Sequence, residues 1–300
     1  MIFDYIRETR EPTLLLSALA GLVGLSAAIY YGNASISIGI LTIAGAILAQ
    51  AAVNMIDDYV DFKSGLDKET DKTKFSGGSG LLISGRVKPS FVLIFALVLL
   101  VVAGIIGAYA LINAAHVAFV VFLFIIVGGA GVLFYAKYLV RVPFFAEPFV
   151  ALSFMLIGVG VFLVSSNSMM HILNVLAVCS LAGIQIGAVL ITNEIPDINA
   201  DRKYGRRSGI ALSEGPARAW RLYVGFQVFG YVLLIASIVA GILPLTCLLV
   251  LLFIPAAFYI ATGIISYKNA KAYEKIMKVS ALVCMVYMLV LSAGYLLYLM

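Results

Sequence analysis

The chain has 300 residues, of which 63% are hydrophobic and only 12% are charged, with a formal net charge of +5. A soluble domain carries about twice that share of charged residues, so the composition excludes an ordinary soluble protein, and nothing in it indicates a nucleic-acid partner. Apolar runs of a length that can cross a bilayer as helices recur along the chain. We therefore expect an all-α, polytopic membrane protein that forms a single domain over residues 1–300.

Nine apolar runs predict nine transmembrane helices. They lie near residues 13–31, 35–57, 90–112, 115–136, 144–165, 170–192, 217–241, 244–266 and 277–299. Pro244 and Pro255 fall in the eighth run, and we expect a kink near its middle because proline removes a backbone hydrogen bond. The three cysteines, Cys179, Cys247 and Cys284, are isolated in apolar runs without metal-ligand spacing, and we interpret them as small core or lipid-facing residues.

The charged residues lie on one side of this arrangement. All 20 Lys and Arg residues precede the first predicted helix or fall in the connections after helices two, four, six and eight, flanking helix ends included. The opposite connections, near residues 31–35, 113–115, 165–169 and 241–243, contain none. By the positive-inside rule, this pattern predicts a multi-pass protein of the cell membrane, with the N-terminus and the charged connections in the cytoplasm and the C-terminus outside.

Two long hydrophilic connections, about 59–89 and 193–216, share a weak internal similarity. Each begins with an acidic helix end, passes a basic segment that contains glycine, and leads into a new apolar run. This pattern indicates a possible repeat of helices 1–4 and 5–8, which would place the two acidic helix ends at equivalent positions. We expect them to face each other across a central cavity that opens near the cytoplasmic side.

The acidic helix ends carry the residues most informative about function. If the second helix continues through Asp61, four oxygen-bearing side chains share one helical face, and a similar spacing follows the sixth helix. Clustered carboxylates repel one another unless cations lie between them. Oxygen ligands without His or Cys point to Mg²⁺, with Mn²⁺ as a possible substitute. The candidate metal ligands are Asp57, Asp58, Asp61, Asp197 and Asp201.

Basic and amide side chains on the same side indicate what the metal would carry. A diphosphate bridged to Mg²⁺ would be neutralised by Arg and Lys donors, although topology or lipid headgroups can also account for each single basic residue. Backbone N–H groups of the run Gly77–Gly80 could also cradle phosphate. The candidate diphosphate-binding residues are Arg10, Lys63, Lys137, Arg141, Arg202, Arg206, Asn54 and Asn193.

Several segments together resemble the UbiA superfamily of intramembrane prenyltransferases. The first acidic motif reads Asp57-Asp58-Tyr59-Val60-Asp61 followed by Gly65-Leu66-Asp67, and the second reads Asp197-Ile198-Asn199-Ala200-Asp201-Arg202. The opening Arg10-Glu11-Pro12-Thr13-Leu14 and the later Gly205-Arg206-Arg207-Ser208 are also similar to family segments. The spacing from Asp61 to Asp67, the Gly77-Gly78 pair and Glu147 look most like the branch that prenylates 1,4-dihydroxy-2-naphthoate in menaquinone synthesis, although Asp57 stands where that family commonly has Asn.

The resemblance implies a mechanism and a set of roles. Mg²⁺ would bridge the two acidic motifs through the diphosphate of an allylic isoprenoid donor, and a hydrophobic or aromatic acceptor in the bilayer would capture the prenyl group. The implied catalytic residues are Asp61, Asp197, Asp67 and Tyr135, with Tyr135 supplying an aromatic face to the allylic cation. Asp67 would be a further ligand or an acceptor-side carboxylate.

Three alternatives compete with this interpretation. The acceptor could be a glycerol-phosphate ether-lipid precursor rather than a quinone precursor. A cation-coupled transporter would also carry membrane carboxylates, but it would favour positions near the bilayer midplane. A CDP-alcohol phosphotransferase is associated with an Asp-Gly-x-x-Ala-Arg motif, which this sequence does not contain.

Overall fold

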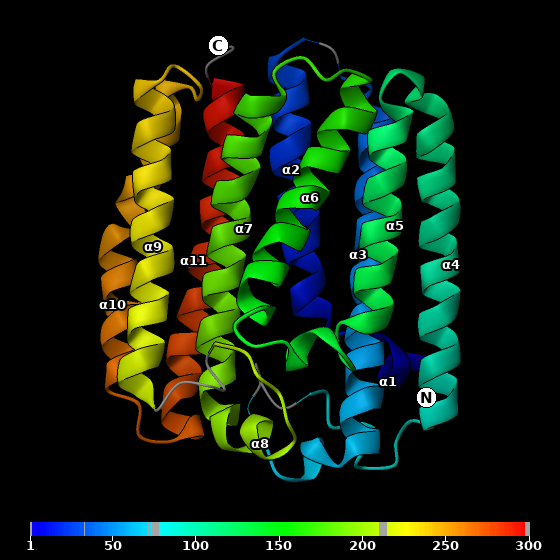
Figure 1. Ribbon diagram of the computed structural model, residues 1–300, viewed down its shortest axis with the longest axis vertical. Coiled ribbons are helices and arrows are strands. Elements are labelled where there is room, and N and C mark those ends of the chain that lie inside the picture. The colour runs from blue at the N-terminus through cyan, green and yellow to red at the C-terminus, as the bar shows by residue number, and fades with distance from the viewer. Residues whose placement is uncertain (1, 33, 71–72, 74–77, 210–214, 298–300) are drawn as a thin grey trace.

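The computed structural model describes residues 2–32, 34–70, 73, 78–209 and 215–297. Over these residues the protein is helical without strands, and the helices stand side by side in one bundle (Figure 1). The α-helices are α1 (Ile2–Arg7), α2 (Glu11–Tyr30), α3 (Ile36–Ser64), α4 (Pro89–Asn113), α5 (Ala118–Phe134), α6 (Ala146–Ser166), α7 (Ile172–Glu194), α8 (Ile198–Lys203), α9 (Pro216–Val239), α10 (Ile254–Ile265) and α11 (Ala270–Leu297). The 3₁₀ segments are η1 (Leu66–Lys68), η2 (Ala115–Val117), η3 (Leu139–Arg141), η4 (Ile195–Asp197) and η5 (Leu245–Phe253).

Nine helical spans in the described part of the chain are long and apolar enough to cross a membrane, which confirms the predicted fold class. The span 172–203 runs through α7, η4 and α8, and the eighth span joins η5 to α10. The expected irregularity of that eighth span takes the form of a change in helix type. The 3₁₀ segment ends at Phe253, and Pro255 lies in the first turn of α10, where its missing N–H is tolerated.

The acidic ends of α3 and α7 lie at the same end of the bundle as α1, and α11 finishes at the opposite end (Figure 1). Helix α3 continues to Ser64, seven residues beyond the predicted span, so the first acidic motif is helical as expected. It ends where Gly65 adopts φ of 85°, a left-handed conformation that glycine reaches without strain, and its N–H bonds back to the carbonyls of Asp61 and Phe62.

The second acidic motif departs from a continuous α-helix. Pro196 has no N–H to donate, and the chain tightens into η4 before resuming as α8. Asn193, Asp197 and Asp201 therefore lie on three successive elements, yet all three still line the same cavity.

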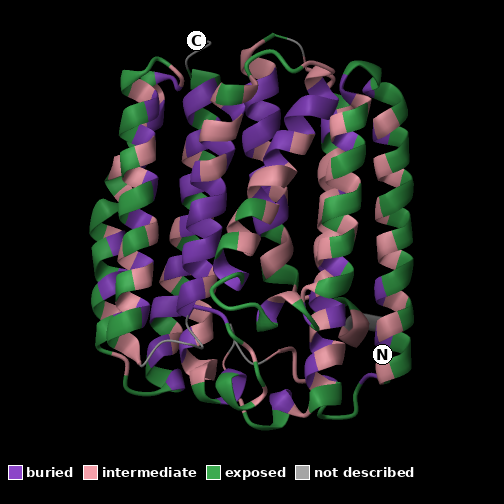
Figure 2. Cartoon of the chain, viewed as in Figure 1, coloured by how far each residue is buried: buried purple, intermediate pink, exposed green. Residues whose placement is uncertain are grey.

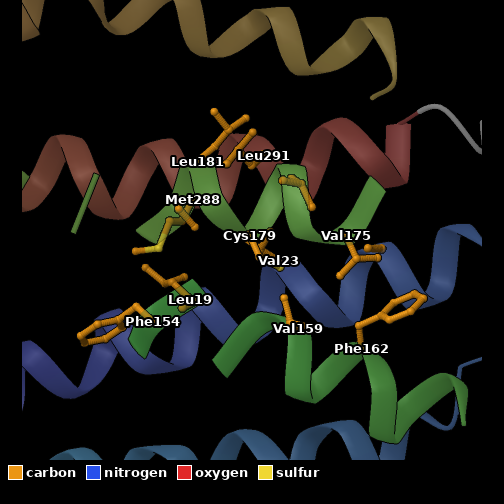
Figure 3. Close-up of a cluster of buried hydrophobic side chains, with 14 of the residues drawn as sticks. Leu19, Val23, Phe154, Val159, Phe162, Val175, Cys179, Leu181, Met288 and Leu291 are labelled. Carbon is orange, nitrogen blue, oxygen red and sulfur yellow. The ribbon is translucent and has the colours of Figure 1, made fainter. Parts of the chain in front are cut away.

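The core lies between α2, α6, α7 and α11, and Figure 3 shows side chains from all four helices meeting there. In the most apolar part of the α7 span, 78% of the residues are buried, whereas in α4 only 11% are. Helix α7 is therefore an inner helix, and α4 faces the lipid. Figure 2 shows the same gradient from the central to the outer helices. All three cysteines are free and buried in this core region, as predicted.

Close approach of α2 to α6 depends on two glycines. A Cβ atom at Gly24 would overlap the backbone carbonyl of Gly158, and a Cβ at Gly158 would lie 2.6 Å from Cys179 Sγ and 2.9 Å from the carbonyl oxygen of Ala20. Because backbone cannot yield as a flexible side chain does, these helices can pack at this distance only without side chains at the contact.

We expect Gly24→Val to lower the free energy of unfolding by at least about 2 kcal/mol, because overpacking forces the two helices apart. Thermal unfolding in detergent measures the change. The matched control is Gly225→Ala on α9, where an added Cβ would meet nothing within 4 Å. Equal unfolding midpoints for the two variants would contradict the packing argument.

Candidate active site

A cavity of about 640 Å³ lies among helices α2 to α7. Its walls along α4, α5 and α6 are formed largely by apolar and small residues, and its polar lining gathers where the two acidic motifs meet. Such a pocket, apolar over most of its surface with a few converging polar groups, is typical of small-molecule sites. The charged and amide residues that line it are Arg10, Gln50, Asn54, Asp57, Asp61, Asp67, Asn193, Glu194, Asp197, Asp201 and Arg206.

Asn54 connects α3 to the segment that precedes α2. Its Nδ2 donates to the carbonyl of Thr9 at 2.8 Å and to Thr13 Oγ1 at 2.7 Å, and its Oδ1 accepts from Gln50 Nε2 at 2.9 Å. These bonds hold in place the turn that contains Arg10, which adopts φ of 54°. The side chain predicted to bind diphosphate thus lines the cavity and also positions a neighbouring arginine.

Arg10 reaches from this turn to the first acidic motif. Its Nη2 donates to Asp57 Oδ2 at 3.3 Å and also bonds to Asp58 Oδ1. Asp58 is only 1% exposed, and its Oδ2 accepts the backbone N–H of Ser79 at 3.0 Å. Both Asp58 oxygens are therefore bonded within the protein, and Asp58 is not among the residues that line the cavity.

Arg206 joins the two acidic motifs. Its Nη2 donates to Asp61 Oδ1 at 2.6 Å and Oδ2 at 2.5 Å, and to Asp57 Oδ1 at 3.1 Å, while its Nε lies 3.6 Å from Asp201 Oδ1. Burial lowers the pKa of the Arg206 guanidinium, but the attraction of Asp61, Asp57 and Asp201 outweighs burial and raises that pKa well above its ordinary value. A permanent positive charge therefore stands between α3 and α8.

The glycine-containing loop folds against the first motif. Gly78 has φ of 69°, and a Cβ atom there would lie 3.2 Å from both Asp58 Oδ1 and Asp67 Oδ1. Gly77 lies outside the described residues, and the N–H of Ser79 is bonded to Asp58 rather than directed at the cavity. In this loop, the backbone group that was expected to cradle phosphate instead fixes a carboxylate.

A family model for the UbiA prenyltransferase family matches residues 14–298, which is nearly the whole chain. The chain belongs to this family. It is 25% identical over 235 residues to a 1,4-dihydroxy-2-naphthoate octaprenyltransferase of Bacillus subtilis (strain 168), covering 78% of this chain and 73% of that protein. The family and this relative together identify the protein as a prenyltransferase.

Solved structures share the fold at low sequence identity. A UbiA homolog from Archaeoglobus fulgidus bound to DMAPP and Mg²⁺ is 14% identical, with a TM-score of 0.64 over 97% of this chain and 99% of that one. A digeranylgeranylglyceryl phosphate synthase is 15% identical, with a TM-score of 0.62 over 98% of both chains. The arrangement of the helices is thus that of the UbiA family.

Four of the basic residues predicted to bind diphosphate lie away from the cavity of this UbiA-family prenyltransferase. Lys63, Lys137, Arg141 and Arg202 are exposed and are absent from the cavity lining. Lys63 Nζ lies 5.8 Å from the ring centroid of Tyr59, and Lys137 Nζ lies 5.1 Å from that of Tyr138. Arg141 borders a separate small depression behind Asp61 and Arg206. The structure therefore brings only Arg10 and Arg206 of the predicted cations to the cavity.

The donor set agrees with a hard divalent cation, because the carboxylates and amides of the cavity offer oxygen atoms without His or Cys. The Oδ1 atom of Asn193 is buried without a hydrogen-bond partner among the described residues, so the polar end contains an unsatisfied oxygen. Among those residues, no three His, Cys, Asp or Glu side chains form a ready group of metal ligands. The nitrogens of Arg206 lie among Asp57, Asp61 and Asp201, so these carboxylates surround the guanidinium instead of one another.

Glu8 and Glu194 are two further acidic groups near the cavity or its motifs, of which Glu8 is buried and Glu194 is partly buried. Glu8 is fully buried, and its Oε2 accepts from Ser79 Oγ at 2.6 Å. Glu194 lines the cavity directly after Asn193. The sequence signal for Glu194 was its place in the second acidic helix end, whereas Glu8 had no signal because it stands in a short charged segment before the first span.

We expect Arg206→Gln to lower the free energy of unfolding by about 3–5 kcal/mol, because it leaves Asp57, Asp61 and Asp201 without their buried counter-ion. Unfolding in detergent with increasing denaturant measures this loss. Lys63→Gln, an exposed cation on α3, is the control and should stay within about 0.5 kcal/mol of the unmodified protein. A similar small change in Arg206→Gln would mean that the carboxylates need no buried arginine.

Glu8 predicts a pH dependence of stability. Burial, followed by the charge of Asp58, raises its pKa to about 7 from 4.5, against the lowering effects of Ser79 and Arg10. Between these two pKa values, the folded state binds more protons than the unfolded state. The stabilisation that Glu8 contributes is therefore fully present below pH 4.5 and is lost as the pH rises through about 7.

Glu8→Gln has no carboxyl group to titrate at this position. We therefore expect its unfolding temperature to fall less between pH 5 and pH 8 than that of the unmodified protein. Differential scanning calorimetry at several pH values measures this slope. Glu11→Gln, an exposed carboxylate in the next turn, is the matched control. An unchanged slope in Glu8→Gln would show that other groups cause the pH dependence.

Proposed function

We propose that the protein transfers a polyprenyl group from an allylic isoprenyl diphosphate to an aromatic acceptor in the membrane, and that transfer requires Mg²⁺. The observation that carries this proposal is the meeting of Asp57, Asp61 and Asp201 around Arg206 at the polar end of a largely apolar cavity. An isoprenyl diphosphate has a charged head and a long apolar tail, which match the polar end and the apolar walls of this cavity.

The residues take distinct roles in this proposal. Asp57, Asp61, Asp197 and Asp201 would hold the metal, and the metal would stabilise the negative charge that develops on the leaving diphosphate. Arg10 and Arg206 carry permanent charges beside these carboxylates and would bind the diphosphate oxygens. Asp58 would act indirectly, by orienting Arg10 and the loop at Ser79. Asp67 lines the same end and is 5% exposed, which fits a further ligand.

An aromatic wall supports a flat acceptor and a cationic intermediate. Tyr135 stacks on Phe149 with ring centroids 5.8 Å apart and an interplanar angle of 18°, and Phe145 stacks on Phe149 at 5.4 Å. Tyr135 and Phe149 both line the cavity. Such faces attract an allylic cation and can stack on an aromatic ring.

We further propose a hydroxylated naphthoate as acceptor, in menaquinone-type quinone synthesis. The relative from Bacillus subtilis supports this choice, and the aromatic wall is consistent with it. The structural likeness to a digeranylgeranylglyceryl phosphate synthase keeps a glycerol-phosphate ether-lipid precursor as the second candidate. The one-sided distribution of basic residues supports a cytoplasmic location for the acidic end of the cavity.

Purified protein in lipid nanodiscs should convert labelled geranylgeranyl diphosphate and 1,4-dihydroxy-2-naphthoate into a prenylated product with Mg²⁺ and not with EDTA. The assay includes 4-hydroxybenzoate and a glycerol-phosphate ether-lipid precursor as competing acceptors. Preferred transfer to the ether-lipid precursor would overturn the proposed acceptor and leave prenyl transfer intact.

We expect Asp61→Ala and Asp197→Ala to lower turnover at least about 100-fold, because each removes a carboxylate that would hold the metal, and the metal would stabilise the leaving diphosphate. Asp4→Asn is the control, since Asp4 pairs with Arg86 at 2.5 Å and lies outside the cavity lining. Full turnover in either alanine variant would rule out the assigned metal ligands.

A further inference from the structure

Glu194 differs in its bonding from the carboxylates that pair with an arginine. Asp57, Asp61 and Asp201 form the salt bridges of Arg206, and Asp58 is held by Arg10. Glu194 also lines the cavity, but its buried Oε2 atom has no hydrogen-bond partner among the described residues. A buried carboxylate oxygen without a partner is costly, so its presence in a substrate cavity requires an explanation.

Glu194 stands outside the Asp-x-x-x-Asp spacing of the proposed metal ligands, and it is not one of the carboxylates that pair with Arg206. The side chain of Ser208 hydrogen-bonds to Glu194, and the charged groups that act on it are Glu147 on α6, Asp201 on α8 and Arg206. Asp61 also has two negative neighbours, Asp57 and Asp67, but it is held by contacts of Arg206 Nη2 at 2.6 and 2.5 Å. Glu194 Oε2 has no such partner among the described residues, so it is available to a hydroxyl group of the acceptor.

Glu194 shares its cavity with the aromatic wall and acts electrostatically on Tyr135. Burial raises the pKa of the Tyr135 hydroxyl well above its ordinary value, and the charge of Glu194 is the next largest cause. Among the carboxylates, Glu194 has the largest electrostatic effect on Tyr135. Glu194 and the stacked rings of Tyr135 and Phe149 line the same cavity.

We propose that Glu194 is the base that takes the proton of the acceptor hydroxyl during prenyl transfer. This inference rests on the proposed function and specifies its acceptor as a hydroxylated aromatic ring. The allylic C–O bond breaks with its electron pair leaving on the diphosphate, and a ring carbon of the acceptor forms the new C–C bond. The hydroxyl proton moves to Glu194 Oε2, which gives the keto form of the prenylated ring and a protonated Glu194, without an oxidant or reductant.

Glu147 provides a matched control. It is also a buried carboxylate at this level of the bundle, with 3% exposure, but it is absent from the cavity lining. Its Oε2 accepts the backbone N–H of Gly209 at 3.0 Å, which holds the segment after α8 against the start of α6. Replacing either glutamate by glutamine preserves the shape of the side chain and removes one carboxylate, but only Glu194 lines the cavity.

The experiment compares Glu194→Gln, Glu194→Asp and Glu147→Gln in nanodiscs with geranylgeranyl diphosphate, Mg²⁺ and 1,4-dihydroxy-2-naphthoate. We expect Glu194→Gln to lower kcat at least about 100-fold, as loss of a general base does, while the KM for geranylgeranyl diphosphate stays unchanged. The wild-type fall in kcat at low pH should disappear in Glu194→Gln and persist in Glu194→Asp. Glu147→Gln should keep kcat near the wild-type value and move the low-pH fall in kcat to lower pH, because it removes a negative charge that acts on Glu194.

Two results would overturn the inference alone. Turnover of Glu194→Gln equal to that of Glu147→Gln would show that the carboxylate is not needed, and a large rise in its KM for geranylgeranyl diphosphate would assign Glu194 to donor binding instead. If the wild-type protein transferred no prenyl group to any acceptor of the panel, the proposed function would fail, and the base assignment would fail with it.

Discussion

The ion pairs of Arg206 with Asp57, Asp61 and Asp201 are the interaction on which the geometry of the site depends. They join the end of α3 to the segment around α8, which are about half a chain apart in sequence. Carboxylates brought together at the end of a membrane bundle would repel one another strongly in a medium of low dielectric constant. The largely buried guanidinium of Arg206 reduces that repulsion and joins the two helix ends.

The same ion pairs bear on how the proposed substrates would bind. Mg²⁺ alone would enter beside two permanent positive charges, Arg10 and Arg206, whereas a free diphosphate would enter beside several carboxylates. Metal and diphosphate together allow both sets of charges to find opposite partners, with arginines on phosphate oxygens and carboxylates on the metal. On the proposed function, donor and metal should therefore bind cooperatively, because each reduces the repulsion that the other meets.

Much of the fold could be predicted from the sequence because it follows from local patterns. Apolar runs of bilayer length identified the spans, and the spacing of Asn54, Asp57 and Asp61 placed them on one face of α3. The choice among basic residues could not be made in this way. Arg202 and Arg206 are four residues apart, but α8 ends at Lys203 and Gly205 turns the chain with φ of 80°. Only this turn directs Arg206 inward and leaves Arg202 exposed.

Hydrogen bonding between distant segments explains the other differences from the sequence-based expectations. Asp58 has the residue type and spacing of a metal ligand, yet the chain brings Arg10 and the N–H of Ser79 onto its two oxygens. No local pattern encodes that pairing, since its partners lie 48 and 21 residues away. Whether a given carboxylate is paired is a property of the folded chain.

Pairing also separates the acidic residues into two chemical kinds. Asp57, Asp61 and Asp201 form salt bridges with Arg206, whereas Glu194 Oε2 has no hydrogen-bond partner among the described residues. Prenyl transfer to a hydroxylated ring, as proposed, releases an anion from the donor and a proton from the acceptor. On that proposal, the carboxylates around Arg206 would serve the metal and the diphosphate, and Glu194 would serve the acceptor.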